Sequence, residues 1–199
     1  SHAAAYAVVA YQTAFLKFYY PKEFMAALMT SVMDNTTKVS EYILACRNMG
    51  IPILPPDINE GYSGFSVSGN GIRYGLSAIK SVGRAVVDVI IAERENGGLF
   101  KSLDDFVSRM SNKEVNKRTL ESFIKSGALD TLPGTRKQKL IVSGDLLESK
   151  AREKKTVMEG QLSFFDLAAE EEKDNFQITF PNVGEYEKQT LLAFEKETI

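Results

Sequence analysis

Two glycine-containing stretches carry the basic residues best placed to hold a phosphate. In the first, residues 76–85, Lys80 and Arg84 flank Gly83. A tight turn brings the backbone close to an anion, a glycine removes the side chain that would block it, and the next helix directs its first amides there. Such contacts grip a phosphate backbone without reading bases. The alternative is an ordinary helical turn that ends on a glycine, and these residues alone do not decide between the two.

The second stretch repeats this logic further along the chain. A predicted helix at 116–126 enters the loop 127–134, and Arg136 and Lys137 then open the next helix, with Lys117 and Arg118 nearby. A basic helix start after a glycine-containing loop suits a phosphate, although a turn with a solvated basic face has the same pattern. Two such elements in one basic block shift the balance toward DNA.

A short apolar motif stands in the polar stretch near the end of the chain, formed by Gln161, Leu162, Phe164 and Phe165. Apolar residues outside a globular core either fold back onto it or anchor a partner. An extended segment could offer the amide of Gln161 for hydrogen bonds and the apolar side chains to a pocket. Both alternatives stay open from these residues alone.

Catalytic and metal chemistry are not predicted for this chain. Nucleotidyl transfer needs carboxylates that hold two metal ions, whereas Asp104 and Asp105 are adjacent and diverge on a helix. One cysteine and one histidine cannot build a zinc site. Cys46 lies on an apolar helical face, which indicates a buried, inert thiol, and it fits a reducing cytosol.

The elements that position these residues are predominantly helical. Periodicity and boundary residues predict helices at about 3–20, 21–33, 84–95, 102–110, 115–126, 135–154 and 184–197, and one from a cap among Asn35, Thr36 and Thr37 to Gly50. Strand competes at 84–95, which is rich in Val and Ile, but its length favours helix. Alternation across 65–74 around Gly69-Asn70-Gly71 predicts one small β-hairpin. The predicted fold class is mainly α.

Charge is distributed unevenly along the chain. The net charge of −2 combines a neutral segment 1–79, a segment 80–155 with sixteen basic and eleven acidic residues, and a segment 156–199 with three basic and ten acidic ones. A basic block indicates a polyanion-binding surface, and a solvated surface is the alternative. The apolar stretch 3–20 contains Gln12, Thr13 and Lys17, which argue against a membrane span and favour a buried core helix.

The sequence resembles the C-family replicative polymerases of bacteria, the alpha subunits of DNA polymerase III. The resemblance is carried by residues 1–7, 11–14, 20–21, 23–27, 46–50, 54–59, 74–76, 78–80, 83, 116–118, 120–121, 126–128 and 195–197. It implies that 1–60 is the C-terminal part of the polymerase fingers, 61–155 a tandem helix-hairpin-helix DNA-binding domain, 156–183 a linker with a clamp-binding motif, and 184–199 a helix leading toward an OB domain. The start without Met, inside a helical pattern, indicates an excised fragment.

The resemblance also implies roles for particular residues. His2 is a candidate contact for the incoming deoxynucleoside triphosphate. The candidate contacts to primer-template duplex are Lys80, Gly83, Arg84, Lys117, Arg118, Arg136 and Lys137, and those to the sliding clamp are Gln161, Leu162, Phe164 and Phe165. Ser81 stands where the first hairpin usually has a glycine, and Phe164 where the clamp motif often has leucine.

The resemblance places the parent enzyme in the cytoplasm, without a membrane and among other replisome subunits. Its magnesium-binding palm aspartates would lie upstream, so this fragment is expected to need no cofactor and to be inactive as a polymerase. One alternative is a stand-alone helix-hairpin-helix protein of DNA repair or a scaffold. The other is a helical protein-interaction domain without a DNA role.

Overall fold

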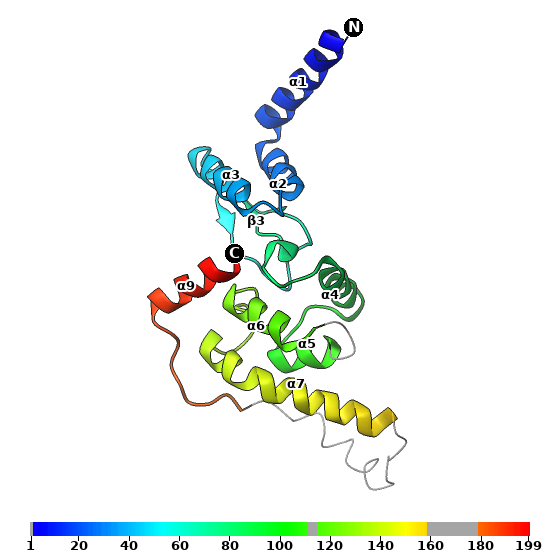
Figure 1. The fold of residues 1–199 in the computed structure, drawn as a ribbon, viewed down its shortest axis with the longest axis vertical. Helices are drawn as coiled ribbons and strands as arrows, with labels where there is room; N and C mark the ends of the chain where they lie inside the picture. The colour runs from blue at the N-terminus through cyan, green and yellow to red at the C-terminus, as the bar shows by residue number, and fades with distance from the viewer. Residues whose placement is uncertain (1, 111–114, 159–178) are drawn as a thin grey trace.

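The computed structural model of the 199-residue chain describes residues 2–110, 115–158 and 179–199. The fold is mainly helical with one small sheet, which confirms the predicted class (Figure 1). Its elements are α1 (His2–Tyr19), α2 (Pro21–Ser31), α3 (Thr36–Asn48), β1 (Ile53–Leu54), β2 (Ser66–Ser68), β3 (Gly71–Arg73), the 3₁₀ helix η1 (Leu76–Ala78), α4 (Arg84–Gly97), α5 (Leu103–Met110), α6 (Lys117–Lys125), α7 (Arg136–Met158) and α9 (Lys188–Thr198).

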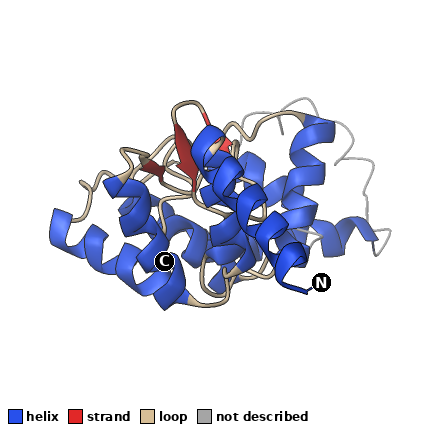
Figure 2. Ribbon diagram, turned by 90° about the horizontal axis from the view of Figure 1, so that it is seen from above, coloured by secondary structure: helices blue, strands red, loops and turns tan. Residues whose placement is uncertain are grey.

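The predicted β-hairpin is present as β2 and β3, with Val67 opposite Ile72 in antiparallel register. Because Ser68 pairs with Gly71, the two turn residues are Gly69 and Asn70. The positive φ, 57°, lies at Gly69 rather than at Asn70. A third strand, β1, pairs in parallel with β3 and gives the order β1-β3-β2. The sequence does not reveal this strand, because two residues before a Pro-Pro pair show no alternation. Seen from above, the strands form a small part of a helical molecule (Figure 2).

The first hydrophobic cluster joins α2 and α3 to this sheet. Met29 and Cys46 are fully buried there, and the rings of Phe65 and Tyr74 meet edge to face at 4.8 Å between centroids. Burial raises the pKa of the Cys46 thiol, which disfavours the reactive thiolate and fits the predicted inert role. The boundary predicted near residue 60 stays a prediction, although the sheet packs with α2 and α3.

Helix α1 differs from the expectation of a buried core helix. Every residue from His2 to Tyr20 is exposed, and the helix extends away from the other elements (Figure 1). Aromatic side chains follow one another at helical spacing, and the rings of Phe15 and Tyr19 lie 4.5 Å apart. The prediction of a helix is therefore confirmed, whereas the prediction that this helix is buried in a core is wrong for the part of the chain that the structure describes.

The second hydrophobic cluster is built by α4, α5, α6 and α7. Phe106 is fully buried at its centre and meets Phe100 at 5.1 Å and Phe123 at 6.1 Å, both edge to face. Residues 84–97 are helix, as predicted against the strand alternative. Helix α9 packs beside α6 (Figure 1), and Ile199, which follows the helix, packs against the first cluster.

Candidate nucleic-acid interface

The first hairpin lies between η1 and α4. Ile79 and Val82 are buried in the second cluster and anchor the loop from beneath. Lys80, Gly83 and Arg84 are exposed. Because buried apolar residues and exposed residues are interspersed in this turn, its backbone and the two cations face outward.

Ser81 has the strained backbone of this turn. Its φ of 66° lies in the left-handed region, which among the described residues no other non-glycine residue adopts. That conformation costs a residue with a Cβ roughly 1–2 kcal/mol, and a glycine avoids the cost. With serine in place of the family's glycine, the turn therefore keeps its conformation but is strained at Ser81.

The start of α4 is open. Gly83, its N-cap, has an extended backbone with φ −77°, and no side chain caps the helix. A Cβ at Gly83 would meet nothing within 4 Å, so neither conformation nor packing within the described chain requires glycine here. The free amides of the first helical turn give this end a partial positive charge, and Arg84 adds a full one.

The start of α6 lies against this hairpin. The hydroxyl of Thr119 donates to the backbone oxygen of Ser81 at 3.4 Å, and the Asn116 side chain caps α6 by accepting from the Thr119 amide at 3.0 Å. Lys117 and Arg118 are exposed in the same turn. The structure thus brings two of the predicted basic groups, 80–84 and 117–118, into one neighbourhood.

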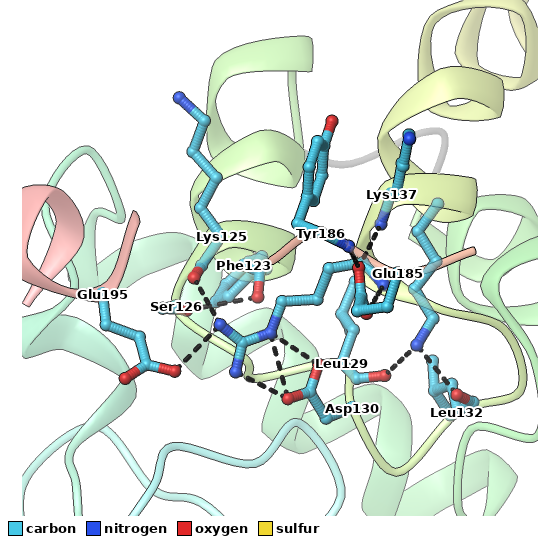
Figure 3. A network of polar contacts seen from close by, with 12 residues as sticks. Phe123, Lys125, Ser126, Leu129, Asp130, Leu132, Lys137, Glu185, Tyr186 and Glu195 are labelled. Atoms are coloured by element: carbon cyan, nitrogen blue, oxygen red, sulfur yellow. Dashed lines mark hydrogen bonds and ion pairs between the residues drawn. The ribbon is translucent and has the colours of Figure 1, made fainter. Parts of the chain in front are cut away.

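The second hairpin is arranged differently around Arg136. That side chain is 10% exposed, and its guanidinium binds Asp130 at 2.7 Å, Glu195 at 2.9 Å and the backbone oxygen of Lys125 at 3.1 Å (Figure 3). Burial alone would lower the pKa of Arg136, but the two carboxylates together raise it. The guanidinium is engaged within the chain, so we leave Arg136 out of the proposed phosphate surface.

An internal carboxylate occupies the first turn of α7. Glu185 accepts from the backbone amides of Arg136 at 2.8 Å and Lys137 at 3.1 Å, and from its neighbour Tyr186 at 2.8 Å (Figure 3). Glu185 is exposed, and the desolvation that remains opposes its ionisation, but these amides and the Arg136 charge outweigh it and lower the pKa of Glu185. The Lys137 ammonium lies 5.5 Å from the centroid of the Tyr186 ring. The predicted phosphate position of this hairpin therefore holds a carboxylate.

Lys80 and Lys125 both reach the end of α9. Lys80 donates from its ammonium to the backbone oxygen of Glu197 at 2.8 Å and from its amide to that of Thr198 at 2.9 Å. The Lys125 ammonium lies 3.6 Å from the Glu197 carboxylate. Lys125 is not among the predicted contacts, although Ile-Lys-Ser occurs in both hairpins, at 79–81 and 124–126.

Lys139 is a second residue that the sequence did not single out. It is fully buried, and its ammonium donates to the backbone oxygens of Leu129 and Leu132, each at 2.8 Å. Burial lowers its pKa. Helical periodicity alone cannot distinguish this lysine from an exposed one, because its two acceptors lie in the preceding loop.

The other predicted site residues lie elsewhere. His2 is exposed at the start of α1, at the end of the molecule far from both hairpins (Figure 1). Gln161, Leu162, Phe164 and Phe165 lie outside the described residues. No group of three or more His, Cys, Asp or Glu side chains within 2–110, 115–158 and 179–199 is arranged to hold a metal ion. In the same ranges no helix is long and apolar enough to cross a membrane.

Known proteins match both the hairpin region and the complete chain. A family model described as a helix-hairpin-helix motif matches residues 50–139. DNA polymerase III subunit alpha of Borreliella burgdorferi is 42% identical over all of this chain, and those of Vibrio cholerae and Escherichia coli strain K12 are also 42% identical over its full length. The chain is similar along its whole length to DNA polymerase III alpha subunits. This finding confirms the resemblance seen in the sequence.

The chain covers 17% of the length of each of these three relatives. It is therefore similar to one stretch of a much longer protein, and the matched helix-hairpin-helix region contains both basic hairpins. DNA binding is the property that this motif suggests for the chain.

Proposed function

We propose that this chain grips the phosphates of duplex DNA, without reading bases, for a replicative DNA-directed DNA polymerase. The proposed phosphate contacts are made by the open start of α4, at Gly83 and Arg84. Lys117 and Arg118 at the start of α6 add to them, and Lys80 lies at the edge of this surface. In this proposal residues 1–60 belong to the polymerase fingers and 61–155 to a tandem helix-hairpin-helix domain, and residue 184 begins the approach to an OB domain.

The open Gly83 carries the proposal. Its φ of −77° suits any residue and a Cβ there would enter empty space, so the use of glycine fits an external group that approaches the backbone. The uncapped amides of α4 suit an anion. Similarity to DNA polymerase III alpha subunits over the complete chain supports DNA as that anion's source and favours a polymerase over a stand-alone repair or scaffold protein.

The salt dependence of duplex binding tests the grip. In the intact protein, Arg84→Ala should reduce the slope of log affinity against log salt by roughly 1, because one phosphate contact is lost. Arg47→Ala, an exposed arginine on α3, is the matched control and should leave the slope unchanged. Equal slopes for Arg84→Ala and the unaltered protein would mean that Arg84 faces water. Binding that depends strongly on base sequence would also contradict the proposed contacts.

Gly83→Ala tests the close approach separately from charge. The new methyl group should weaken duplex binding while the chain unfolds at nearly the same temperature, since within the described chain it meets open space. The expected stability change is below about 1 kcal/mol, the usual scale for replacing an N-cap glycine by alanine. Unchanged DNA affinity in this variant would remove Gly83 from the interface.

Nucleotidyl transfer belongs, in this proposal, to the intact polymerase. On the family resemblance, we assign the magnesium site to the palm of the intact polymerase. The 199-residue chain alone should not extend a primer when magnesium and all four nucleotides are supplied. Extension by a verified pure sample would contradict this assignment.

We further propose that Gln161, Leu162, Phe164 and Phe165 bind the ring-shaped sliding clamp. The pattern of a glutamine followed by bulky apolar residues and the family resemblance support this role. A peptide of residues 157–167 should bind the clamp, and a peptide with Gln161→Ala, Phe164→Ala and Phe165→Ala should not. Loss of thermal stability without loss of clamp affinity would instead indicate that the motif folds back onto the chain.

His2 is proposed as a contact to the incoming nucleotide in the intact polymerase. Its exposure at the start of α1 leaves the imidazole accessible to a ligand. His2→Ala should raise KM for the nucleotide or lower kcat, while DNA affinity stays the same. Unchanged kinetics would exclude His2 from the site.

A further inference from the structure

We propose that the second hairpin is an intramolecular docking site for residues 179–199, with the Glu185 carboxylate in the position of a phosphate, and that DNA meets the first hairpin and the start of α6 instead. This division of roles presupposes the DNA-binding function proposed above and narrows the surface that DNA contacts.

The anion position at α7 is complete without an external ligand. Glu185 accepts from the first two amides of the helix, those of Arg136 and Lys137, at 2.8 and 3.1 Å. These amides would otherwise be free to bind an anion at this helix start. The guanidinium of Arg136 turns to Asp130 and Glu195, so the strongest cation of this hairpin is also engaged within the chain.

The chain before Glu185 is fixed to the same helix start by packing. The ring of Phe180 lies so close to Gly134 that a Cβ on that glycine would stand 2.8 Å from the ring. Gly134 has a φ of 92°, which also favours glycine. The side-chain amide of Gln138 donates to the backbone oxygen of Pro181 at 2.9 Å. Glu185 is therefore one of several contacts that hold this segment.

Beyond Glu185, helix α9 continues the docked segment to the first hairpin. The Lys125 ammonium lies 5.3 Å from the centroid of the Phe194 ring, and that ring meets Tyr186 edge to face at 5.2 Å. Lys80 then holds the backbone oxygens of Glu197 and Thr198. Much of the acidic charge of this segment is thus set against the basic block, which lowers the field that the second hairpin offers to DNA.

A plug that DNA displaces would use the same carboxylate but behave differently. Displacement would break the contacts of Phe180, Gln138 and Phe194 as well as those of Glu185. Because aromatic and backbone contacts would all be lost for one phosphate, the geometry favours permanent docking.

Hydrogen exchange of the intact protein tests the docking without DNA. Glu185→Gln removes the charge and keeps the shape of the side chain. The amides of Arg136 and Lys137 should then exchange at least about fivefold faster, because they lose a charge-assisted acceptor. The amides of α9 should also exchange faster, because the segment that carries this helix loses one of its contacts to α7. Glu187→Gln is the control, since Glu187 is exposed and its side chain does not cap α9. Equal exchange in the two variants would overturn the role of Glu185.

Duplex binding by the same protein tests the division between the hairpins. Arg84→Ala should lower the salt slope by roughly 1, whereas Lys137→Ala should leave it unchanged and Glu185→Gln should leave the affinity within about twofold. A tightening of more than about fivefold in Glu185→Gln, with a steeper slope, would identify a displaceable plug and overturn permanent docking. Absence of any salt-dependent duplex binding would instead refute the proposed DNA function, and hydrogen exchange would still decide the docking.

Discussion

The two hairpins begin alike and end in different surroundings. Each follows Ile-Lys-Ser, at 79–81 and at 124–126, and each turns through a residue with positive φ. In the first hairpin Ser81 takes that conformation and the next helix begins at an exposed, uncapped glycine. In the second it falls one residue later, on Gly127, against the side chain of Arg136. After the same local turn, the start of the next helix can therefore be open to solvent or occupied by other residues of the chain.

What decides the difference is the chain that covers the helix start. At α7 the segment from Phe180 to Tyr186 supplies a ring, a backbone oxygen and a carboxylate. At α4 none of the described residues caps the helix with a side chain. A helix-hairpin-helix outline thus specifies an anion site, while distant residues determine whether that anion comes from the protein.

Gly127→Ala should have the largest effect on this comparison. Alanine at φ 83° is strained, and its Cβ would clash with the Arg136 guanidinium and stand 3.0 Å from the Asp130 carboxylate. The two costs together predict a loss of at least about 2 kcal/mol in the free energy of unfolding. Urea denaturation measures it, with Gly83→Ala as the control that meets open space. Equal losses in the two variants would show that the second hairpin is no more tightly filled than the first.

Lys139→Met should have the next largest effect and should act on the second hairpin alone. Methionine keeps the buried stem but removes the ammonium that donates to the backbone oxygens of Leu129 and Leu132, and only the Leu129 oxygen keeps another donor, the Leu132 amide at 3.0 Å, within the described residues. The loss of two charge-assisted bonds, one of which leaves the Leu132 oxygen unpaired, outweighs the relief of a buried charge, so a net loss of about 1–3 kcal/mol in the free energy of unfolding is expected. Thermal unfolding beside exposed Lys188→Met checks it. A more stable Lys139→Met protein would mean that burying the ammonium costs more than its bonds return.

Local signals in the sequence predicted much of the helical framework. Asn35 accepts from the Lys38 amide at 3.1 Å, and Thr135 accepts from the Gln138 amide at the same distance, as their positions before helices suggest. Ser102 caps α5 by accepting from the Asp105 amide at 3.0 Å, and the Asp105 carboxylate accepts from the Lys101 amide at 2.9 Å. A cap depends on residues three apart, so a short window of sequence contains it.

The contacts that separate the two hairpins are not local. Glu185 lies 49 residues from Arg136 along the chain, and Gln138 binds the backbone oxygen of Pro181 across 43. No spacing rule connects such positions, so the sequence alone predicts Arg136 and Lys137 as candidate phosphate contacts. The exposure of α1 is equally non-local, because an apolar stretch predicts a helix without specifying what packs on it.

Ser81→Gly should have a smaller effect, in the opposite direction. Glycine relieves the left-handed strain at φ 66° but adds backbone freedom to the unfolded chain. The two terms nearly cancel, which leaves a gain of at most about 1 kcal/mol. Differential scanning calorimetry compares it with Ser81→Ala, which keeps the strain and should show no gain. A destabilised Ser81→Gly protein would mean that the serine side chain supports the turn more than its backbone strains it.

The pH dependence of the second hairpin should be the smallest effect, because Glu185 is exposed and its interactions are screened by solvent. Its pKa is lowered in the folded chain from the ordinary value of 4.5. A carboxyl with a depressed folded-state pKa stabilises the fold above its unfolded-state pKa, and this contribution disappears as pH falls through the folded-state pKa. Glu185→Gln should therefore unfold at a lower temperature than the unaltered protein near about pH 7, and the two should converge toward about pH 3. Glu187→Gln, measured alongside, should show no such pH-dependent difference. A gap between Glu185→Gln and the unaltered protein that persists undiminished in acid would trace the effect to side-chain shape rather than charge, and the carboxylate would no longer account for the docking at α7.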